Sequence, residues 1–229
     1  MPVDVWWGSG SGPAWRVLMG LSVKGVPYTS HLLSFSAGDT QSPAFLALNP
    51  RGQVPVIRDG DFVLNESLAI LSWLDDKHPE PPLFGRNAED RGRVWRAIFE
   101  HENHAATPFR NVQRPIFGGR AESDAEEIRK ALVLVHQELG RLEAALEGGY
   151  VVGDALSAAD IVWFCAIAAM IRAATRPAAA GLDLGIWPLG ERYPQIAGWA
   201  AKIEAIPGFT DTVPPHWKEG DNPFPSLSR

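Results

Sequence analysis

Apolar and polar positions follow two different patterns along the 229-residue chain, and the pattern changes near residue 80. Before that point, short β-branched and aromatic runs alternate with amphipathic segments, which is typical of strands alternating with helices. The predicted elements are a strand at 3–7, a helix from Pro13 to Gly25, a strand at 28–33, a helix at 42–48, a hairpin at 54–64 with Asp59-Gly60 at its turn, and a helix at 66–78. The order βαβαββα predicts a mixed four-stranded sheet with helices on its faces.

After a stiff, proline-rich stretch at 79–85, strand signals disappear and the pattern becomes helical. Helices are predicted at 89–107, 123–147, 157–174 and 193–205, and the tail from Pro214 onward reads as irregular. In the second of these helices, apolar residues recur at alternating spacings of four and three, which predicts one buried stripe: Ile128, Leu132, Val135, Leu139, Leu142 and Leu146. We therefore expect an α/β domain at 1–80, a linker at 81–88 and an all-helical bundle domain at 89–229.

Charge and composition exclude several classes of function. The net charge is −6 and the pI is about 5.5, with no Lys/Arg-rich run of the kind that follows a phosphate backbone, so we expect no nucleic-acid partner. The N-terminus lacks a basic segment and a long apolar core, and no apolar stretch is long enough for a membrane span. We therefore expect a cytoplasmic protein without a membrane partner.

The single cysteine, Cys165, lies in an apolar helix and is expected to pack in the core. One cysteine can form neither an internal disulfide nor a Cys-rich metal site. His101 and His104 are three residues apart on a predicted helix, a spacing that suits either a metal pair or two hydrogen-bonded histidines. Because no third ligand is placed near the two histidines, we expect no metal. Because the one cysteine is expected in the core, any thiol chemistry must use a thiol from another molecule.

Pro55 interrupts the first strand of the predicted hairpin, in "NPRGQVPVI". Proline has no N–H to donate and is usually confined to the edge or the start of a strand. Two interpretations stay open for this position. Either Pro55 simply begins an edge strand, or it turns the chain so that Val54 exposes its backbone N–H and C=O to an extended peptide.

"NESLAI" follows ten residues later and places Glu66 and Ser67 at the start of a helix. Free N–H groups at a helix start attract a carboxylate, and a nearby Glu can hold an ammonium group. A ligand with an α-amino acid end would satisfy both groups. The alternative is ordinary capping by Asn65 or Ser67.

"GSGSGPAWR" forms a Gly/Ser turn between the first strand and the first helix. It lacks the spacing of a dinucleotide or phosphate loop. A serine hydroxyl at a helix N-terminus would stabilise a thiolate more than a thiol. The hydroxyl and the backbone N–H groups of the helix both donate hydrogen bonds, and these favour the anion. Ser11 could equally serve only as the helix cap.

Taken in order, these stretches resemble the cytosolic glutathione transferases over essentially the whole chain. "NPRGQVPVI" is similar to the family's glutathione-binding loop with its cis-proline, and "NESLAI" is similar to its Glu-Ser helix motif. "GDALSAADI" is similar to its capping box, in which Ser157 and Asp160 would initiate a helix. The turn "WGSGSGPAWRV" looks most like the serine-type branches, particularly the rho-like and zeta-like ones. The resemblance implies a thioredoxin-like first domain followed by a helical domain.

The resemblance also implies roles for individual residues. Ser11, with Ser9 as the alternative, would activate the thiol of glutathione as a co-substrate, and no metal would be needed. The expected glutathione-binding residues are Gln53, Val54, Pro55, Glu66, Ser67 and Gln41. Where the rho-like pattern has basic residues before "SPE", this chain reads "GDTQSPAF", so Gln41, Gln53 or Arg51 would hold the glycyl carboxylate.

A small hydrophobic electrophile is expected as the second substrate. Its candidate contacts are Gly10, Pro13, His104, Phe109 and Trp217. The expected reaction is conjugation of the thiol to this electrophile, and the expected assembly is a homodimer. The alternatives are a glutathione-dependent isomerase or peroxidase at the same site, and a non-catalytic protein that binds glutathione or hydrophobic ligands.

Overall fold

The computed structural model describes residues 2–218 and 225–227, which form two compact units. The first unit contains the chain up to Leu83 together with residues 206–218, and the second contains 84–205 and 225–227. The C-terminal segment 206–218 therefore packs with the first unit, whereas the sequence placed it in the helical domain. In the part of the chain that is described, no helix is long and apolar enough to cross a membrane.

The first unit is built on one mixed sheet with the strand order β2-β1-β3-β4. The strands are β1 (Val3–Gly8), β2 (Tyr28–Leu33), β3 (Val56–Asp59) and β4 (Phe62–Asn65). β1 runs parallel to β2, whereas β3 is antiparallel to both β1 and β4. The predicted mixed four-stranded sheet is thus confirmed. Asp59 pairs with Phe62, so the hairpin turns at residues 60–61, one residue later than the sequence indicated.

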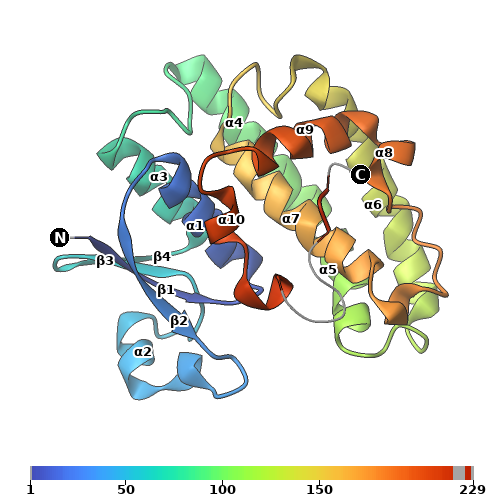
Figure 1. Ribbon diagram of the computed structural model, residues 1–229, viewed down its shortest axis with the longest axis horizontal. Helices are drawn as coiled ribbons and strands as arrows, with labels where there is room; N and C mark the ends of the chain where they lie inside the picture. The colour runs from blue at the N-terminus through green and yellow to red at the C-terminus, as the bar shows by residue number, and fades with distance from the viewer. Residues whose placement is uncertain (1, 219–224, 228–229) are drawn as a thin grey trace. The chain divides into compact units, whose positions relative to one another are not determined.

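Three helices pack around this sheet: α1 (Gly12–Val23), α2 (Pro43–Leu48) and α3 (Ser67–Lys77). α1 and α3 contact each other and lie on one face of the sheet (Figure 1). Lys24 Nζ lies 2.6 Å from Asp75 Oδ1, and both side chains are buried. The same carboxylate oxygen accepts a hydrogen bond from Leu83 N at 2.7 Å, so one buried ion pair joins α1, α3 and the segment that follows α3.

The C-terminal segment 206–218 returns to α1 and contains the short helix α10 (Phe209–Thr212) and a 3-10 turn at Pro215–Trp217 (Figure 1). Trp15 of α1 is the anchor, because its Nε1 donates to Thr212 Oγ1 at 3.0 Å. The Trp15 ring also meets the Trp217 ring edge-on, with 5.2 Å between centroids. The tail predicted to be irregular from Pro214 onward thus contains one 3-10 turn, while its residues 219–224 and 228–229 lie outside the described residues.

The second unit is helical, as the sequence predicted. Its helices are α4 (Ala88–Glu100), α5 (Ala106–Phe117), α6 (Ala125–Ala145), α7 (Ala158–Ala174), α8 (Leu189–Arg192) and α9 (Pro194–Glu204). The six apolar residues of the stripe predicted on the second helix are all buried. Cys165 is buried in α7, as expected.

The helix predicted at 89–107 continues to Phe117, which the sequence analysis missed. The predicted end lies just before Pro108, and proline cannot donate the next backbone hydrogen bond of a helix. Instead, a π-helical segment at His101–Ala105 joins α4 to α5, and Pro108 is the third residue of α5. The wider π-helical turn shifts the backbone hydrogen-bond pattern shortly before Pro108, which has no N–H to donate. The chain can therefore stay helical through the proline.

The predicted capping box begins α7, and it is confirmed. Asp160 is fully buried and accepts hydrogen bonds from Ser157 N at 2.8 Å, from Val151 N at 2.9 Å and from Trp199 Nε1 at 2.9 Å. Burial raises the pKa of Asp160, and these donors oppose that rise. One carboxyl group thus fixes the start of α7, the segment before it and α9.

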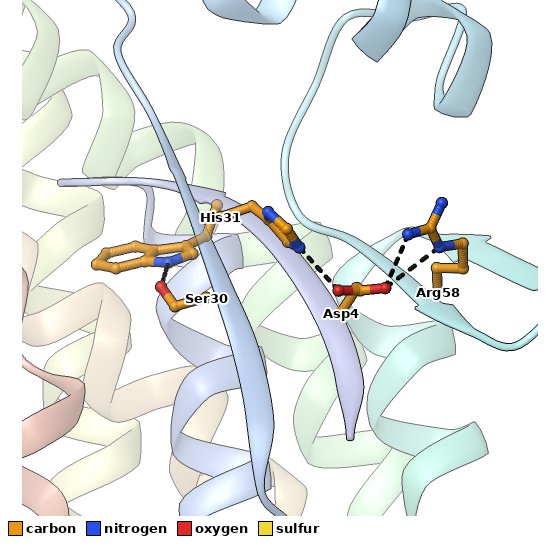
Figure 2. Close-up of polar contacts among 5 residues, drawn as sticks. Asp4, Ser30, His31 and Arg58 are labelled. Carbon is orange, nitrogen blue, oxygen red and sulfur yellow. Dashed lines mark hydrogen bonds and ion pairs between the residues drawn. The ribbon is translucent and has the colours of Figure 1, made fainter. Parts of the chain in front are cut away.

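A polar cluster lies across β2, β1 and β3. Figure 2 shows Asp4 between His31 and Arg58. Asp4 Oδ1 lies 2.8 Å from His31 Nε2, and Asp4 Oδ2 accepts from both Arg58 Nε at 3.2 Å and Arg58 Nη2 at 2.9 Å. Trp6 lies between the same two partners, stacked on His31 at 4.5 Å and beneath the Arg58 guanidinium at 5.1 Å. Hydrogen bonds from His31 and then Arg58 lower the pKa of Asp4.

This lowered pKa predicts a pH-dependent contribution to stability. The ionised form of Asp4 is favoured in the folded state, so its contribution is present above the ordinary carboxyl pKa of 3.8 and is lost as pH falls through the lowered value. We expect Asp4→Asn to have a smaller free energy of unfolding in urea than wild type at pH 7. This difference in free energy should shrink toward pH 3. Asp61→Asn, at the exposed hairpin turn, controls for the change of charge. A difference that stays constant from pH 7 to pH 3 would contradict this account.

Candidate active site

The directions of the strands bring three short segments to one edge of the sheet. Because β3 is antiparallel to β1, it begins where β1 ends, and because β4 is antiparallel to β3, it ends at that same edge. Val56 accordingly pairs with Trp6 of β1 and with Asn65 of β4. The turn after β1, the loop before β3 and the start of α3 therefore meet at this edge of the first unit.

The turn after β1 carries the predicted thiol-activating serine. Ser11 N donates to Gly8 O at 3.1 Å, which closes a four-residue turn. Gly10 lies third in this turn with φ of +89°, a conformation that other residues rarely adopt. Ser11 is the N-cap of α1, and its Oγ accepts a hydrogen bond from Ala14 N at 3.2 Å. Pro13 is therefore the second residue of α1, one position later than predicted.

Ser9, the alternative serine, has a different partner. Its Oγ lies 2.5 Å from Nδ1 of His216, in the 3-10 turn of the C-terminal segment. His216 was not predicted from the sequence, because it lies 207 residues from Ser9 along the chain and belongs to no local motif. The only signal was its neighbour Trp217, which had been predicted to border the site.

The loop before β3 is shaped by Asn49, whose side chain is buried. Asn49 Nδ2 donates to Gln53 O at 2.7 Å, and Asn49 Oδ1 accepts from Arg51 N at 3.1 Å. The Val54-Pro55 peptide bond is cis, as the family pattern implied. Pro55 is buried, while Val54 is half-buried and lies two residues before the first residue of β3, outside the sheet.

Gln41 lies against this loop. A Cβ on Gly52 would stand 2.4 Å from Gln41 Nε2 and 2.9 Å from Thr40 O, so only glycine fits at that contact. Gly52 also has φ of +61°, which again favours glycine. The predicted binding residues Gln41, Gln53, Val54 and Pro55 thus lie in one local structure, although their roles toward a ligand remain predictions.

Glu66 and Ser67 form the start of α3. Ser67 is the first residue of the helix and is buried, while Glu66 precedes it and is exposed. The backbone of Glu66 has φ of +69° and ψ of 111°, an unusual conformation for a residue with a side chain. Such positions cost about 1 to 3 kcal/mol and are concentrated at functional sites. The strained residue therefore stands directly before the N–H groups at the start of α3, and its side chain makes no capping hydrogen bond to them.

The predicted electrophile contacts divide between the two units. Gly10, Pro13 and Trp217 belong to the first, where the Cβ position of Gly10 lies 3.8 Å from Trp217 Nε1. Trp217 is 3% exposed, so most of its ring packs in the core of this unit. Phe109 belongs to the second unit, where it is 2% exposed and meets the rings of His101 and Trp163.

His104 also belongs to the second unit and lies on the π-helical segment, where it is exposed. It lines a cavity of about 590 Å³ together with Arg96, Glu100, Glu138 and Arg141. His101 Nδ1 lies 3.0 Å from Glu102 Oε1. Among the described residues, no group of three or more His, Cys, Asp or Glu side chains is placed to hold a metal ion.

Comparison with known proteins identifies the family. Residues 11–77 match the glutathione S-transferase N-terminal domain, and residues 104–207 match the glutathione S-transferase C-terminal domain. Glutathione S-transferase Z2 of Arabidopsis thaliana is 31% identical over 220 residues, which cover 93% of this chain and 90% of that relative. The chain belongs to the glutathione S-transferase family. Its similarity to glutathione S-transferase Z1 of the same plant, at 28% identity, supports the expected zeta-like kinship.

Two further relatives cover nearly the full length of this glutathione S-transferase. The crystal structure of a glutathione S-transferase from the Antarctic clam Laternula elliptica has a TM-score of 0.82 and 33% identity, and the match covers 100% of this chain and 97% of that one. A probable maleylacetoacetate isomerase of Vibrio cholerae is 29% identical over 89% of this chain and 92% of its own length.

The strained backbone at Glu66 predicts that the usual order of stability of glycine and alanine variants is reversed at this position. In an ordinary helix, glycine is less stable than alanine by about 1 kcal/mol. At residue 66 we expect Glu66→Gly to be more stable than Glu66→Ala by about 1 kcal/mol, because glycine adopts positive φ without steric cost. Urea unfolding of the two variants measures the difference. The same pair at Lys77, in the last turn of α3, should keep the usual order, and the usual order at residue 66 would contradict the strain.

Proposed function

We propose that this protein is a glutathione transferase in which the Ser11 hydroxyl stabilises the thiolate of glutathione, which then attacks a small hydrophobic electrophile. The observation that carries the proposal is the meeting of three element ends at one edge of the sheet: the turn with Ser11, the loop with Val54, and the start of α3 at Glu66. Membership of the family supplies the class of reaction.

In this proposal the tripeptide lies along the edge of the sheet. The backbone of Val54 pairs with the cysteinyl residue of glutathione, in the manner of an added strand. Glu66 holds the ammonium group of the γ-glutamyl end, while Ser67 and the N–H groups of α3 hold its carboxylate. Gln53 and Gln41, which lie in and against the same loop, are donors for the remaining glutathione groups, including the glycyl carboxylate.

Thiol ionisation sets the energy that the turn must supply. Lowering a thiol pKa from about 8.5 by two units requires about 2.7 kcal/mol of preference for the thiolate. Ser11 Oγ already accepts from Ala14 N, so its own hydrogen remains for donation to sulfur. This hydrogen bond and the positive end of the α1 dipole both favour the anion.

The reaction then forms one carbon–sulfur bond with an electron pair from sulfur. In substitution, the electrophile releases its leaving group with the electrons of the broken bond. In conjugate addition, the electrons of the double bond move onto the acceptor, which takes a proton from water. Much of the rate gain comes from thiolate formation and from holding the two reactants together.

A second candidate function is glutathione-dependent isomerisation at the same site. The similarity to the probable maleylacetoacetate isomerase of Vibrio cholerae over nearly its full length favours it. There, the thiolate would add to an activated double bond and leave again, so glutathione is regenerated. Peroxide reduction and non-catalytic binding of hydrophobic ligands are the remaining alternatives.

Ser11→Ala tests the proposed role of the hydroxyl. We expect kcat/KM with aryl halides, enones, isothiocyanates or hydroperoxides to fall about 100-fold, as for the loss of one catalytic donor. The pH at which the bound thiol ionises should rise, as followed by thiolate absorbance of the glutathione complex, while retention on immobilised glutathione should persist. Ser36→Ala, in the exposed loop after β2, is the matched control.

Two results would overturn the proposal in different ways. Wild-type protein that is retained on glutathione yet converts no acceptor of the panel, and isomerises no activated double bond, would support the binding function instead. Full activity of Ser11→Ala would remove the serine from the mechanism and leave the family assignment intact.

We further propose a cytoplasmic homodimer. The cytosol keeps a reduced glutathione pool, which supplies the co-substrate. Large apolar side chains on the surfaces of both units support self-association, with Phe62 of β4 45% exposed and Phe99 of α4 50% exposed. Sedimentation equilibrium should give twice the 25.0 kDa chain mass, and Phe62→Ser should shift the protein toward monomer. A wild-type protein that sediments as one chain at all concentrations would contradict this proposal.

A further inference from the structure

His216 and Ser9 connect the C-terminal segment to the turn that carries Ser11. Ser9 Oγ and His216 Nδ1 are 2.5 Å apart. The imidazole also lies over the turn itself, because a Cβ on Gly10 would stand 3.0 Å from His216 Cε1 and 3.4 Å from Nε2. The ring therefore lies close to the turn at two consecutive residues, and a side chain at residue 10 would require the ring to shift.

Buried packing fixes the position of His216, although His216 itself is exposed. Its neighbour Trp217 is 3% exposed and meets Trp15 edge-on at 5.2 Å. Thr212 accepts the indole hydrogen of Trp15 at 3.0 Å. Trp15 follows Ser11 by four residues in the same stretch of chain, so the segment carrying His216 is anchored to the very helix that Ser11 caps.

The two serines of the turn differ in what their hydroxyl hydrogens can do. Ser11 Oγ is an acceptor in the cap of α1, and its hydrogen remains for a ligand. Ser9 faces an imidazole nitrogen at hydrogen-bond distance. A neutral imidazole with its proton on Nε2 has an accepting Nδ1, and the Ser9 hydroxyl then donates to it.

We propose that His216 is a positioning residue of the thiol site: its Nδ1 accepts the Ser9 hydroxyl, holds the turn of residues 8–11, and thereby directs Ser11 toward sulfur. This inference rests on the proposed role of Ser11 and assigns the two serines separate tasks. Ser11 contacts the thiolate, whereas Ser9 is bound to His216 and does not compete for it. The thiol site therefore includes a residue from the C-terminal end of the chain.

Steady-state kinetics of four variants test the proposal: Ser9→Ala, His216→Ala, the double variant and His216→Asn. Loss of one hydrogen bond should lower kcat about 3- to 10-fold. KM for glutathione should stay within about two-fold, since the tripeptide is held mainly by the loop before β3 and the start of α3. The double variant should be no worse than either single one, because both remove the same interaction.

His216→Asn should recover most of the lost kcat, because the asparagine Oδ1 can accept a hydrogen bond at about the position of Nδ1. A purely structural role in packing would not predict this recovery, since Asn is smaller than His. His78→Ala, at the end of α3, controls for the loss of an imidazole elsewhere in the first unit. Additive losses in the double variant, or no recovery with asparagine, would overturn the proposal.

Nitrogen NMR of the imidazole decides the pairing without any activity. The His216 signals, assigned by their absence in His216→Ala, should show an unprotonated Nδ1 and a protonated Nε2 at neutral pH, and Ser9→Ala should shift Nδ1. A protonated Nδ1, or signals that Ser9→Ala does not move, would overturn the proposal. Full activity of Ser11→Ala would instead contradict the role proposed for Ser11. The pairing of Ser9 with His216 would then still be tested by these spectra, which do not depend on activity.

Discussion

The candidate site depends on one constraint: backbone groups at the ends of strands and helices have no partners within those elements. Here the strand directions bring several such ends together, because β1 and β4 finish where β3 begins. α1 and α3 start immediately beyond these strands, so their free N–H groups face the same edge. An extended peptide with charged ends would supply the missing partners, which is the physical reason for proposing glutathione at this edge.

Holding these ends in place requires support from the rest of the first unit. The turn and the loop use glycines at positive φ, and Glu66 keeps a strained backbone without being glycine. Such conformations persist only where the surrounding structure determines them. Asn49 determines the loop through two hydrogen bonds, and the buried pair of Lys24 and Asp75 fixes α1 relative to α3. The structure therefore stabilises the helices and the loop around Glu66, the residue with a side chain that has positive φ among the described residues of the first unit.

Local pattern was sufficient for most of the fold and for the segments of the candidate site. The short apolar runs of the strands, the stripe on α6 and the capping box at Ser157 all depend on neighbours in sequence, so the chain itself displays them. Prediction failed where a distant contact or an unusual local geometry decides the outcome. Pro108 ends a helix by local rules, yet the π-helical segment carries the chain past it. The return of residues 206–218 to α1 depends on Trp15, which shares no pattern with Thr212 or Trp217.

The difference between local pattern and long-range contact also separates the proposed thiol site from the proposed acceptor site. The proposed thiol side consists of element ends whose positions follow from strand direction, and its residues can therefore be predicted from short motifs. The proposed acceptor side includes Trp217, whose place depends on long-range packing that no motif encodes. His216 connects the two, since it follows the same long-range packing as its neighbour Trp217 and contacts the turn of Ser9 and Gly10. If both proposals hold, sequence changes in the C-terminal segment would alter the geometry of thiol activation as well as the choice of acceptor.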